Sequence, residues 1–163
     1  MVRRMADNDA RPGERALSFD PGQTAQAGLA FIGHLATPWR KGDCPKNLTE
    51  ARSRGGLFQA VVDPAYRPGL DGLLPGDGVI LLYWMAEARR DLIVQSPAHR
   101  PAPRGVFALR SPARPNPVAL ACVRLLDIDH AAGILTVDAL DAFDGTPLLD
   151  IKPWLPGVDN LNA

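Results

Sequence analysis

The chain has 163 residues, of which 46% are hydrophobic and 22% charged, and lysine plus arginine equals aspartate plus glutamate at 18 each. These values exclude a disordered chain, a collagen-like chain and a coiled coil, and they leave no net charge that would draw the protein to nucleic acid or membrane. Glycine and proline, with 15 and 16 residues, argue against long helices and favour short strands joined by ordered loops.

Residues 1–27 are polar and lack periodic hydrophobicity, so we expect an N-terminal extension or arm rather than a signal peptide. One domain is expected over residues 28–158, followed by a tail over 159–163. No apolar run reaches the ~20 residues needed to span a bilayer, which predicts a cytoplasmic protein with no membrane partner. Cys44 and Cys122 cannot form a disulfide framework, and we expect both to be buried thiols that act as small hydrophobes.

Short apolar runs in chain order predict strands at 29–36, 57–63, 79–85, 106–109, 118–128 and 134–140. One helical turn is expected near 49–52, a glycine-rich connection over 68–78, and an irregular arginine-bearing loop over 89–104. The run 79–85 is continuously apolar, which indicates burial on both faces or the wall of a barrel. Crossover helices are missing between the strands, so the sequence favours an all-β fold, namely a small closed single-sheet β-barrel with a few short helical turns.

Several common catalytic motifs are absent. The chain has no G-x-x-x-x-G-K-[ST], no strand followed by G-x-G-x-x-G, and no G-x-S-x-G. His34, His99 and His130 are scattered without cysteine pairs or an H-E-x-x-H motif, so no metal site is expected and each histidine is interpreted as structural or surface.

Charge is distributed in two blocks. Residues 89–114 hold six arginines opposed by Asp91 alone, and residues 127–150 hold six aspartates and no lysine or arginine. The basic block could meet phosphates, as nucleic-acid-binding surfaces do, and the acidic block could meet hydroxyls, amines or a cationic cofactor. The alternative is that the two blocks only neutralise each other in the fold or form solvated faces.

Two proline-rich segments carry more specific information. In 110–117 the prolines at 112, 115 and 117 forbid a helix and pre-order Arg110, Arg114 and Asn116, which suits a rigid ligand-binding loop. In 143–154, Asp144 and Gly145 predict a tight turn with Thr146 hydrogen-bonded locally, and Asp150 and Lys152 share one face of an extended chain. For this second segment, a structural turn with an ion pair is as consistent with the pattern as a binding site.

Together these segments resemble the TrmO (YaeB/TsaA-like) family of tRNA methyltransferases over roughly residues 29–158. The matching pieces are Ile32-Gly33, Thr37-Pro38, Pro45-Lys46-Asn47, the hydrophobic run 79–85, and the segments 105–117 and 144–154. The last two match the family patterns R-S-x-x-R-P-N-P and D-G-T-P-x-x-D-I-K-P-Y, and they are highly specific.

The resemblance implies a homodimeric β-barrel that binds S-adenosylmethionine and methylates the exocyclic amine of threonylcarbamoyladenosine beside the tRNA anticodon. The tRNA anticodon loop is thus an expected partner, on whose bases Trp39 or Trp154 could stack. Carried over by motif, the cofactor contacts are Pro45, Lys46, Asn47, Leu48, Ala86, Glu87, Arg110, Leu120, Asp138, Ala139, Leu140 and Asp141. The substrate contacts inferred from the two specific segments 105–117 and 144–154 are Arg114, Asn116, Asp144 and Lys152. No catalytic residue is assigned, because methyl transfer to an amine depends on in-line positioning more than on an acid or base.

The chain also departs from the family pattern. The arginine of P-R-Q is replaced by Lys46, the histidine before the hydrophobic strand is absent at Asp77-Gly78, and the closing aromatic is Trp154. The additional C-terminal domain of longer members is not expected here. Two alternatives therefore stay open, a paralogue that methylates a small molecule and a non-catalytic S-adenosylmethionine-binding regulatory protein.

Overall fold

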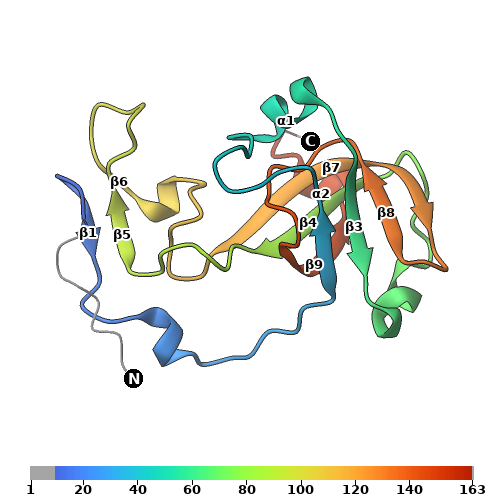
Figure 1. Cartoon of the computed structure of the whole chain (residues 1–163), viewed down its shortest axis with the longest axis horizontal. Helices are drawn as coiled ribbons and strands as arrows, with labels where there is room; N and C mark the ends of the chain where they lie inside the picture. Colours follow the sequence, from blue (N-terminus) through green and yellow to red (C-terminus); the bar gives the residue numbers. More distant parts are fainter. Residues whose placement is uncertain (1–9, 163) are drawn as a thin grey trace. The chain divides into compact units, whose positions relative to one another are not determined.

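The computed structural model describes residues 10–162. They divide into two compact units, each of which is coloured by sequence in Figure 1. The first unit comprises the N-terminal segment up to Gly28 together with Glu87–Pro117, and the second comprises Leu29–Ala86 and the chain from Val118 onward. The domain expected to be continuous over 28–158 is therefore interrupted by an insertion that belongs with the N-terminal segment.

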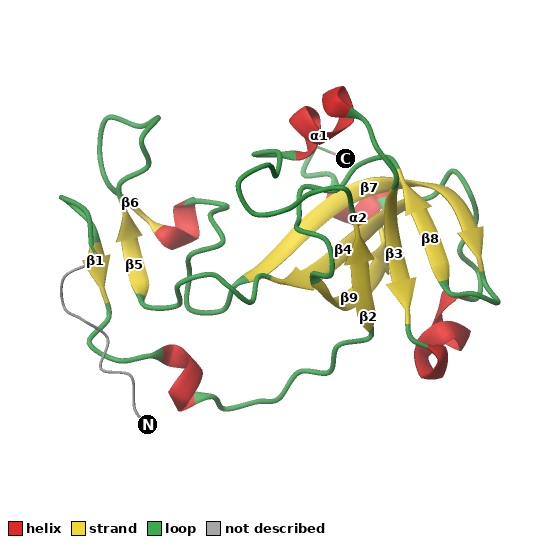
Figure 2. Ribbon diagram, in the orientation of Figure 1, coloured by secondary structure: helices red, strands yellow, loops and turns green. Residues whose placement is uncertain are grey.

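The second unit is built on six strands, drawn as yellow arrows in Figure 2. They are β2 (Gly33–Ala36), β3 (Phe58–Val62), β4 (Gly78–Trp84), β7 (Val118–Asp129), β8 (Ile134–Val137) and β9 (Pro147–Pro153). Neighbouring strands are antiparallel, and the pairing closes into a barrel in the order β2-β3-β8-β7-β4-β9, because β9 pairs with both β4 and β2. The short helical segments of this unit are α1 (Leu48–Arg54), η2 (Pro64–Leu70) and α2 (Pro156–Asp159). The expected mostly-β fold with short helices is confirmed.

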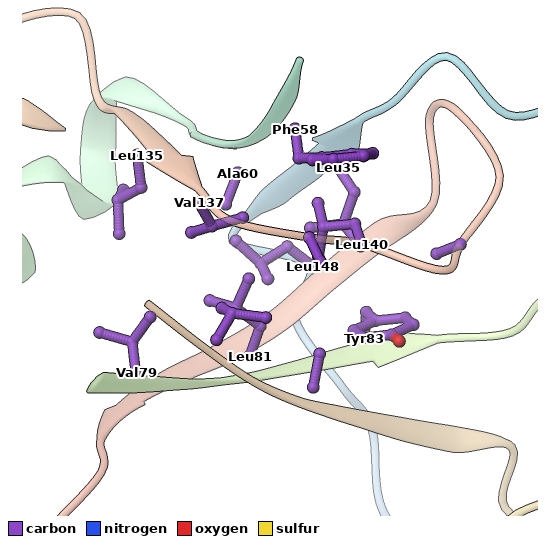
Figure 3. Packing of buried hydrophobic residues seen from close by; sticks show 14 of the residues in the cluster. Leu35, Phe58, Ala60, Val79, Leu81, Tyr83, Leu135, Val137, Leu140 and Leu148 are labelled. Carbon is purple, nitrogen blue, oxygen red and sulfur yellow. The ribbon is translucent and has the colours of Figure 1, made fainter. Parts of the chain in front are cut away.

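Alternation along the strands determines the core of the barrel. In β4, Val79, Leu81 and Tyr83 are buried while their neighbours are half-buried, so the apolar run forms a wall rather than a strand buried on both faces. These inward side chains pack with leucines and valines from the other strands (Figure 3). Cys122 points the other way and is exposed, opposite Ile80 on the outer face of the barrel, so its expected burial is wrong. The apolar residues on both sides of Cys122 hid the alternation of inward and outward side chains along β7.

The first unit contains β1 (Arg15–Ala16), η1 (Pro21–Thr24), β5 (Leu92–Gln95), β6 (Arg104–Gly105) and η3 (Val106–Ala108). The strands form a three-stranded sheet in the order β1-β5-β6, so residues 10–162 contain a second sheet beside the barrel rather than the single sheet expected. The segments expected as a bare arm and an irregular loop thus pair with each other. The strand expected at 106–109 is a 3₁₀ turn, because Leu109 N–H bonds back to the Val106 carbonyl (3.1 Å). Periodicity cannot distinguish strand from helix in so short an apolar run.

Some strand boundaries also differ from expectation. The first barrel strand starts at Gly33 rather than near residue 29, and the strand expected over 134–140 ends at Val137. At Gly33 a Cβ would lie 1.9 Å from the Val61 carbonyl oxygen, so only glycine permits this approach to β3. Strand β9 was not predicted as such, because its charged residues and terminal prolines hide the alternation. None of the described helices is long and apolar enough to cross a bilayer.

Candidate functional site

The strand directions bring most of the expected cofactor residues to one end of the barrel. Strands β2, β4 and β8 finish at the end where β3, β7 and β9 begin, since all neighbours are antiparallel. We call this the site end. It carries the β2–β3 connection, the residues after β4, the start of β7 and most of the β8–β9 connection, which together include Pro45, Lys46, Asn47, Leu48, Ala86, Leu120, Ala139, Leu140 and Asp141. Asp138, the first residue after β8, lies instead beside Arg124, which pairs with Gly78 at the start of β4. The grouping follows from the topology, although these residues lie almost 100 positions apart in sequence.

Hydrogen bonds join the β2–β3 connection to the β8–β9 connection. The Thr37 hydroxyl donates to the Ala142 carbonyl (2.8 Å), and the Thr37 backbone N–H donates to Asp144 Oδ1 (3.1 Å). The Trp39 indole N–H donates to the Leu140 carbonyl (2.6 Å). Trp39 is only 5% exposed, so it braces the two connections and is not available to stack on a base, contrary to the expectation from sequence.

The segment that contains Pro45, Lys46, Asn47 and Leu48 is fixed by the start of α1. Asn47 is the N-cap, and its side-chain oxygen accepts from the Glu50 backbone N–H (2.9 Å). Glu50 accepts in return from the Lys46 backbone N–H (3.1 Å), as in a capping box shifted by one residue. Pro45 is buried, while the Lys46 and Asn47 side chains are exposed. The cap thus holds a cationic and an amide group at the surface of the site end.

The two aspartates assigned to the cofactor differ in how their oxygens are used. Asp138 accepts from Arg52 Nε at one oxygen (2.7 Å) and from the Arg124 backbone N–H at the other (2.8 Å). Asp141 accepts from the Tyr83 hydroxyl at Oδ1 (3.0 Å), and within residues 10–162 its Oδ2 has no hydrogen-bond partner. No buried side-chain polar atom among them lacks a partner, so Oδ2 is open to solvent. Asp141 therefore keeps one carboxylate oxygen without a hydrogen bond, whereas each oxygen of Asp138 already accepts one.

Burial and the Asp141 charge determine the protonation of two neighbouring groups. Burial raises the pKa of the Tyr83 hydroxyl far above its usual range, and the charge of Asp141 raises it further. Burial also raises the pKa of the Cys44 thiol to about 11, with Asp141 adding to the rise and Arg54 opposing it. Both groups are neutral at pH 7, so Tyr83 is a hydrogen-bond donor and Cys44 is not a thiolate nucleophile.

A shallow hollow of about 210 Å³ lies on the outer side of β7. Its lining combines two arginines, a carboxylate, an indole and a thiol, and consists of Arg52, Gly78, Cys122, Val123, Arg124, Asp138 and Trp154. It is smaller than the ~300–1,000 Å³ of typical small-molecule sites. Asp138 therefore faces this outer hollow, while Asp141 is bonded to the inward-facing Tyr83.

The remaining expected residues of the basic block belong to the first unit. Glu87, Arg110 and Asn116 are exposed there. The Arg114 guanidinium donates to three carbonyls of its own loop, at Val106 (2.9 Å), Leu109 (3.2 Å) and Ser111 (3.4 Å). Asn116 accepts from Arg90 Nη2 through its side-chain oxygen (3.1 Å). Arg114 and Asn116 thus order the proline-rich loop, whereas the Arg110 side chain projects from it.

The segment 143–154 contains the tight turn and the ion pair that its sequence predicts. Asp144 lies in a turn with Gly145 at φ 78°, and the Thr146 hydroxyl donates to the Phe143 carbonyl (2.7 Å). Lys152 and Asp150 form an exposed ion pair (3.0 Å). Asp144 is at the site end, but Lys152 pairs with Ile80 near the opposite end of the barrel. The structure therefore does not bring Lys152 together with the other expected site residues.

Sequence reasoning missed three residues of the two units. Tyr83 was overlooked because it lies within the apolar run 79–85. A tyrosine that faces the core needs a hydrogen-bond acceptor for its hydroxyl, which could have signalled its role. Cys44 gave no signal, because its proximity to Asp141 depends on the tertiary fold. Phe107 is 80% exposed beside the arginine-rich loop, and the apolar context suggested a strand residue instead. In the part of the chain described, no three His, Cys, Asp or Glu side chains are grouped closely enough to hold a metal ion.

These features define a six-stranded barrel in which most of the expected cofactor residues lie on the connections at one end. Residues 34–160 match the family model of the tRNA-methyltransferase O N-terminal domain. The chain belongs to this TrmO family.

Individual relatives agree with that assignment. A protein of Archaeoglobus fulgidus named "Probable S-adenosyl-L-methionine-binding protein" is 39% identical over 137 residues, covering 82% of this chain and 35% of its own length. A "tRNA (adenine(37)-N6)-methyltransferase" of Eikenella corrodens is 52% identical over 56 residues, 34% of this chain and 32% of that protein. A crystal structure of TrmO from P. aeruginosa matches with a TM-score of 0.65 and 28% identity, over 84% of this chain and 58% of that one. The chain thus spans about a third of the Archaeoglobus relative and somewhat over half of the TrmO structure.

Proposed function

We propose that this protein is an S-adenosylmethionine-dependent methyltransferase that acts on an adenosine in tRNA. The observation that carries the proposal is the match of residues 34–160 to the tRNA-methyltransferase O N-terminal domain. The names of the Archaeoglobus and Eikenella relatives support the cofactor and the reaction respectively. The acceptor proposed is the exocyclic amine of threonylcarbamoyladenosine beside the anticodon.

The residues at the site end fit this cofactor chemically. S-adenosylmethionine presents an ammonium, ribose hydroxyls and an adenine amine as hydrogen-bond donors, and its sulfonium supplies a methyl group that an amine nitrogen can take up. The open Oδ2 of Asp141 can accept from such a donor. Lys46 can pair with a carboxylate, and by the family motif Arg110 is a further candidate cation. Because Cys44 is a neutral thiol, it does not compete with the substrate for the methyl group.

The groups proposed to meet RNA are in the first unit. Phe107 is 80% exposed and Arg104 and Arg110 are exposed beside it in sequence, a combination typical of proteins that stack and neutralise single-stranded RNA. The acidic residue of this block, Asp91, is neutralised by a bidentate ion pair with Arg89 (2.8 and 3.0 Å). Binding to tRNA should therefore weaken steeply as salt rises.

A homodimer in the cytoplasm is proposed as the working form. Strand β7 exposes Val118 (37%), Leu120 (43%) and Leu126 (54%) on the outer face of the barrel. Exposed apolar side chains of this size, here interrupted by Arg124, are more frequent on surfaces covered by a partner. Light scattering coupled to gel filtration tests it, and a monomeric mass at micromolar concentration would contradict it.

The enzyme proposal is tested by incubating the protein with methyl-labelled S-adenosylmethionine and tRNA from cells with or without the threonylcarbamoyl modification. We expect label in the modified tRNA and at least tenfold less with Arg110→Ala, if one charge-assisted contact is lost. Label in neither tRNA, with S-adenosylmethionine bound, would favour the non-catalytic S-adenosylmethionine-binding protein. Label in a small molecule alone would favour the small-molecule paralogue.

A further inference from the structure

The Asp141 carboxylate is anchored at one oxygen and open at the other. Its Oδ1 accepts from the Tyr83 hydroxyl at 3.0 Å, while Oδ2 is used by no residue of the described chain and is reached by solvent. A carboxylate that turns freely about its side-chain bonds would have to be ordered when a ligand binds. Anchoring one oxygen removes that cost and leaves the second oxygen with a defined direction.

Tyr83 is suited to anchor this group because it is itself immobile. Its ring is 3% exposed and lies in the barrel core on the inward side of β4, level with Leu148 of β9 (Figure 3). Its hydroxyl is protonated at neutral pH, because burial and the charge of Asp141 both raise its pKa far above the usual range. The Tyr83 hydroxyl is therefore a permanent donor at a fixed position.

Asp138, three residues before Asp141 in the same β8–β9 connection, provides a matched contrast. Both of its oxygens are occupied, by Arg52 Nε (2.7 Å) and by the Arg124 backbone N–H (2.8 Å). A ligand could bond to it only by displacing a partner or sharing an oxygen. The two acidic residues therefore have different tasks, one holding α1 to the barrel and the other facing a ligand.

We propose that Tyr83 is a positioning residue that fixes Asp141 so that its Oδ2 accepts a hydrogen bond from a cationic or hydroxyl donor group of the bound ligand. This inference rests on the proposed function, in which the ligand is S-adenosylmethionine. It assigns the donor-recognising carboxylate to Asp141 rather than Asp138.

The test compares Tyr83→Phe with wild type by calorimetric titration with S-adenosylmethionine. We expect the dissociation constant to rise about tenfold, since a hydrogen bond to a charged group is removed while the ring stays in the core. Asp141→Asn should weaken binding at least as much, and the double variant should be no weaker than Asp141→Asn alone. Additive losses, or unchanged binding by Tyr83→Phe, would overturn the positioning role.

Two controls distinguish a loss of Asp141 positioning from a general loss of structure and from failure of the proposed function. Tyr66→Phe removes an exposed hydroxyl from η2, at the opposite end of the barrel, and should bind as wild type does. In ligand-free protein, three-bond couplings should show one Asp141 χ1 rotamer in wild type and averaging in Tyr83→Phe. If wild type binds no S-adenosylmethionine, the proposed function and the ligand assigned to Asp141 fail, whereas averaged couplings in wild type would overturn the anchoring itself.

Discussion

The two units of the chain are held together by different kinds of interaction. The barrel unit buries a continuous apolar cluster that includes Leu35, Leu81 and Leu135, all fully inaccessible. The first unit buries few large apolar side chains, chiefly Leu92 and Val106, and with them the polar residues Asp91 and Gln95. Its order depends on side chains that bond to backbone carbonyls, such as Gln95 to Ala113 and Arg90 to Pro115.

The difference shows how two units with different sources of stability can share one chain. Apolar burial stabilises by ~25 cal/mol per Å² and is spread over many residues, so the barrel tolerates polar connections at its site end. Each buried polar contact of the first unit is worth only ~1 kcal/mol net, but losing one partner costs more because the other is left unsatisfied. We therefore expect the first unit to open locally before the barrel unfolds.

The largest effect is expected from Gly33→Ala in the barrel. The added Cβ would meet the Val61 carbonyl oxygen at 1.9 Å, and a backbone atom cannot move aside cheaply. We expect a loss of ~3 kcal/mol or more in the free energy of unfolding, measured by urea titration with tryptophan fluorescence. All three tryptophans belong to the barrel unit, so this signal reports on that unit alone.

The control for that experiment is Gly69→Ala, because a Cβ at Gly69 has no atom within 4 Å and its φ is not positive. Its unfolding midpoint should equal that of wild type. A Gly33→Ala midpoint as high as wild type would mean that the close approach of β2 and β3 is not required for the barrel.

The next effect is expected from Asp91→Asn in the first unit. The substitution leaves the Arg89 guanidinium without its bidentate partner, and Asp91 is 4% exposed, so we expect a cost of ~2 kcal/mol. Hydrogen exchange of the amides in β5 should accelerate by more than tenfold, while the tryptophan unfolding curve of the barrel stays within ~0.5 kcal/mol of wild type. Equal loss in both units would show that they are one cooperative structure and would break the comparison.

Acid should likewise destabilise the first unit of the wild-type protein more than the barrel. The hydrogen bonds from Arg89 hold the pKa of Asp91 below its usual value, so the ionised carboxylate stabilises the first unit at all pH values above about 4. That stabilisation is lost as the pH falls through the lowered pKa. Exchange protection of β5, corrected for the intrinsic rate, should drop below pH 4 in wild type and much less in Asp91→Asn. Parallel pH profiles for the two proteins would contradict this origin.

The smallest effect is expected for the alkylation rates of the two thiols. Cys122 lies on the outer face of the barrel, whereas Cys44 packs against its core. Cys122 is exposed and should react readily with iodoacetamide at pH 8. Cys44 is half-buried with a pKa of about 11, so its alkylation should be slow and should rise roughly tenfold per pH unit up to that value. Asp141→Asn should speed Cys44 alkylation by removing a nearby negative charge. Equal rates for both thiols, measured by peptide mass spectrometry, would refute this ordering.

The elements that could be predicted from sequence are those with long local patterns. The apolar runs 79–85 and 118–128 correspond to β4 and β7, and the Asp144-Gly145 turn was identifiable from its residue types. The first unit could not be predicted, because β1 and β5 pair across more than seventy residues and neither strand alternates clearly. Short strands of this kind are specified by tertiary contacts rather than by local propensity.

For the candidate site, the sequence proposed segments but could not predict how their atoms are used. The family motif gave Asp138 and Asp141 the same role as cofactor contacts. They are distinguished only by their hydrogen-bond donors, which are Arg52 and Arg124 for the first and Tyr83 for the second. Trp39 was expected to stack on a base because the family resemblance implied an anticodon-loop substrate, whereas its indole N–H is buried and donates to the Leu140 carbonyl. Hydrogen-bond partners far apart in sequence leave no local pattern.

The central claim is that the cofactor is held by the connections at the site end of the barrel. The most direct test is hydrogen exchange of the wild-type protein with and without saturating S-adenosylmethionine. We predict that added cofactor slows exchange in residues 37–48 and 138–146, and leaves the opposite end, residues 63–73 and 129–133, unchanged. Protection confined to the opposite end, or no protection anywhere at concentrations that saturate relatives of this family, would contradict the account.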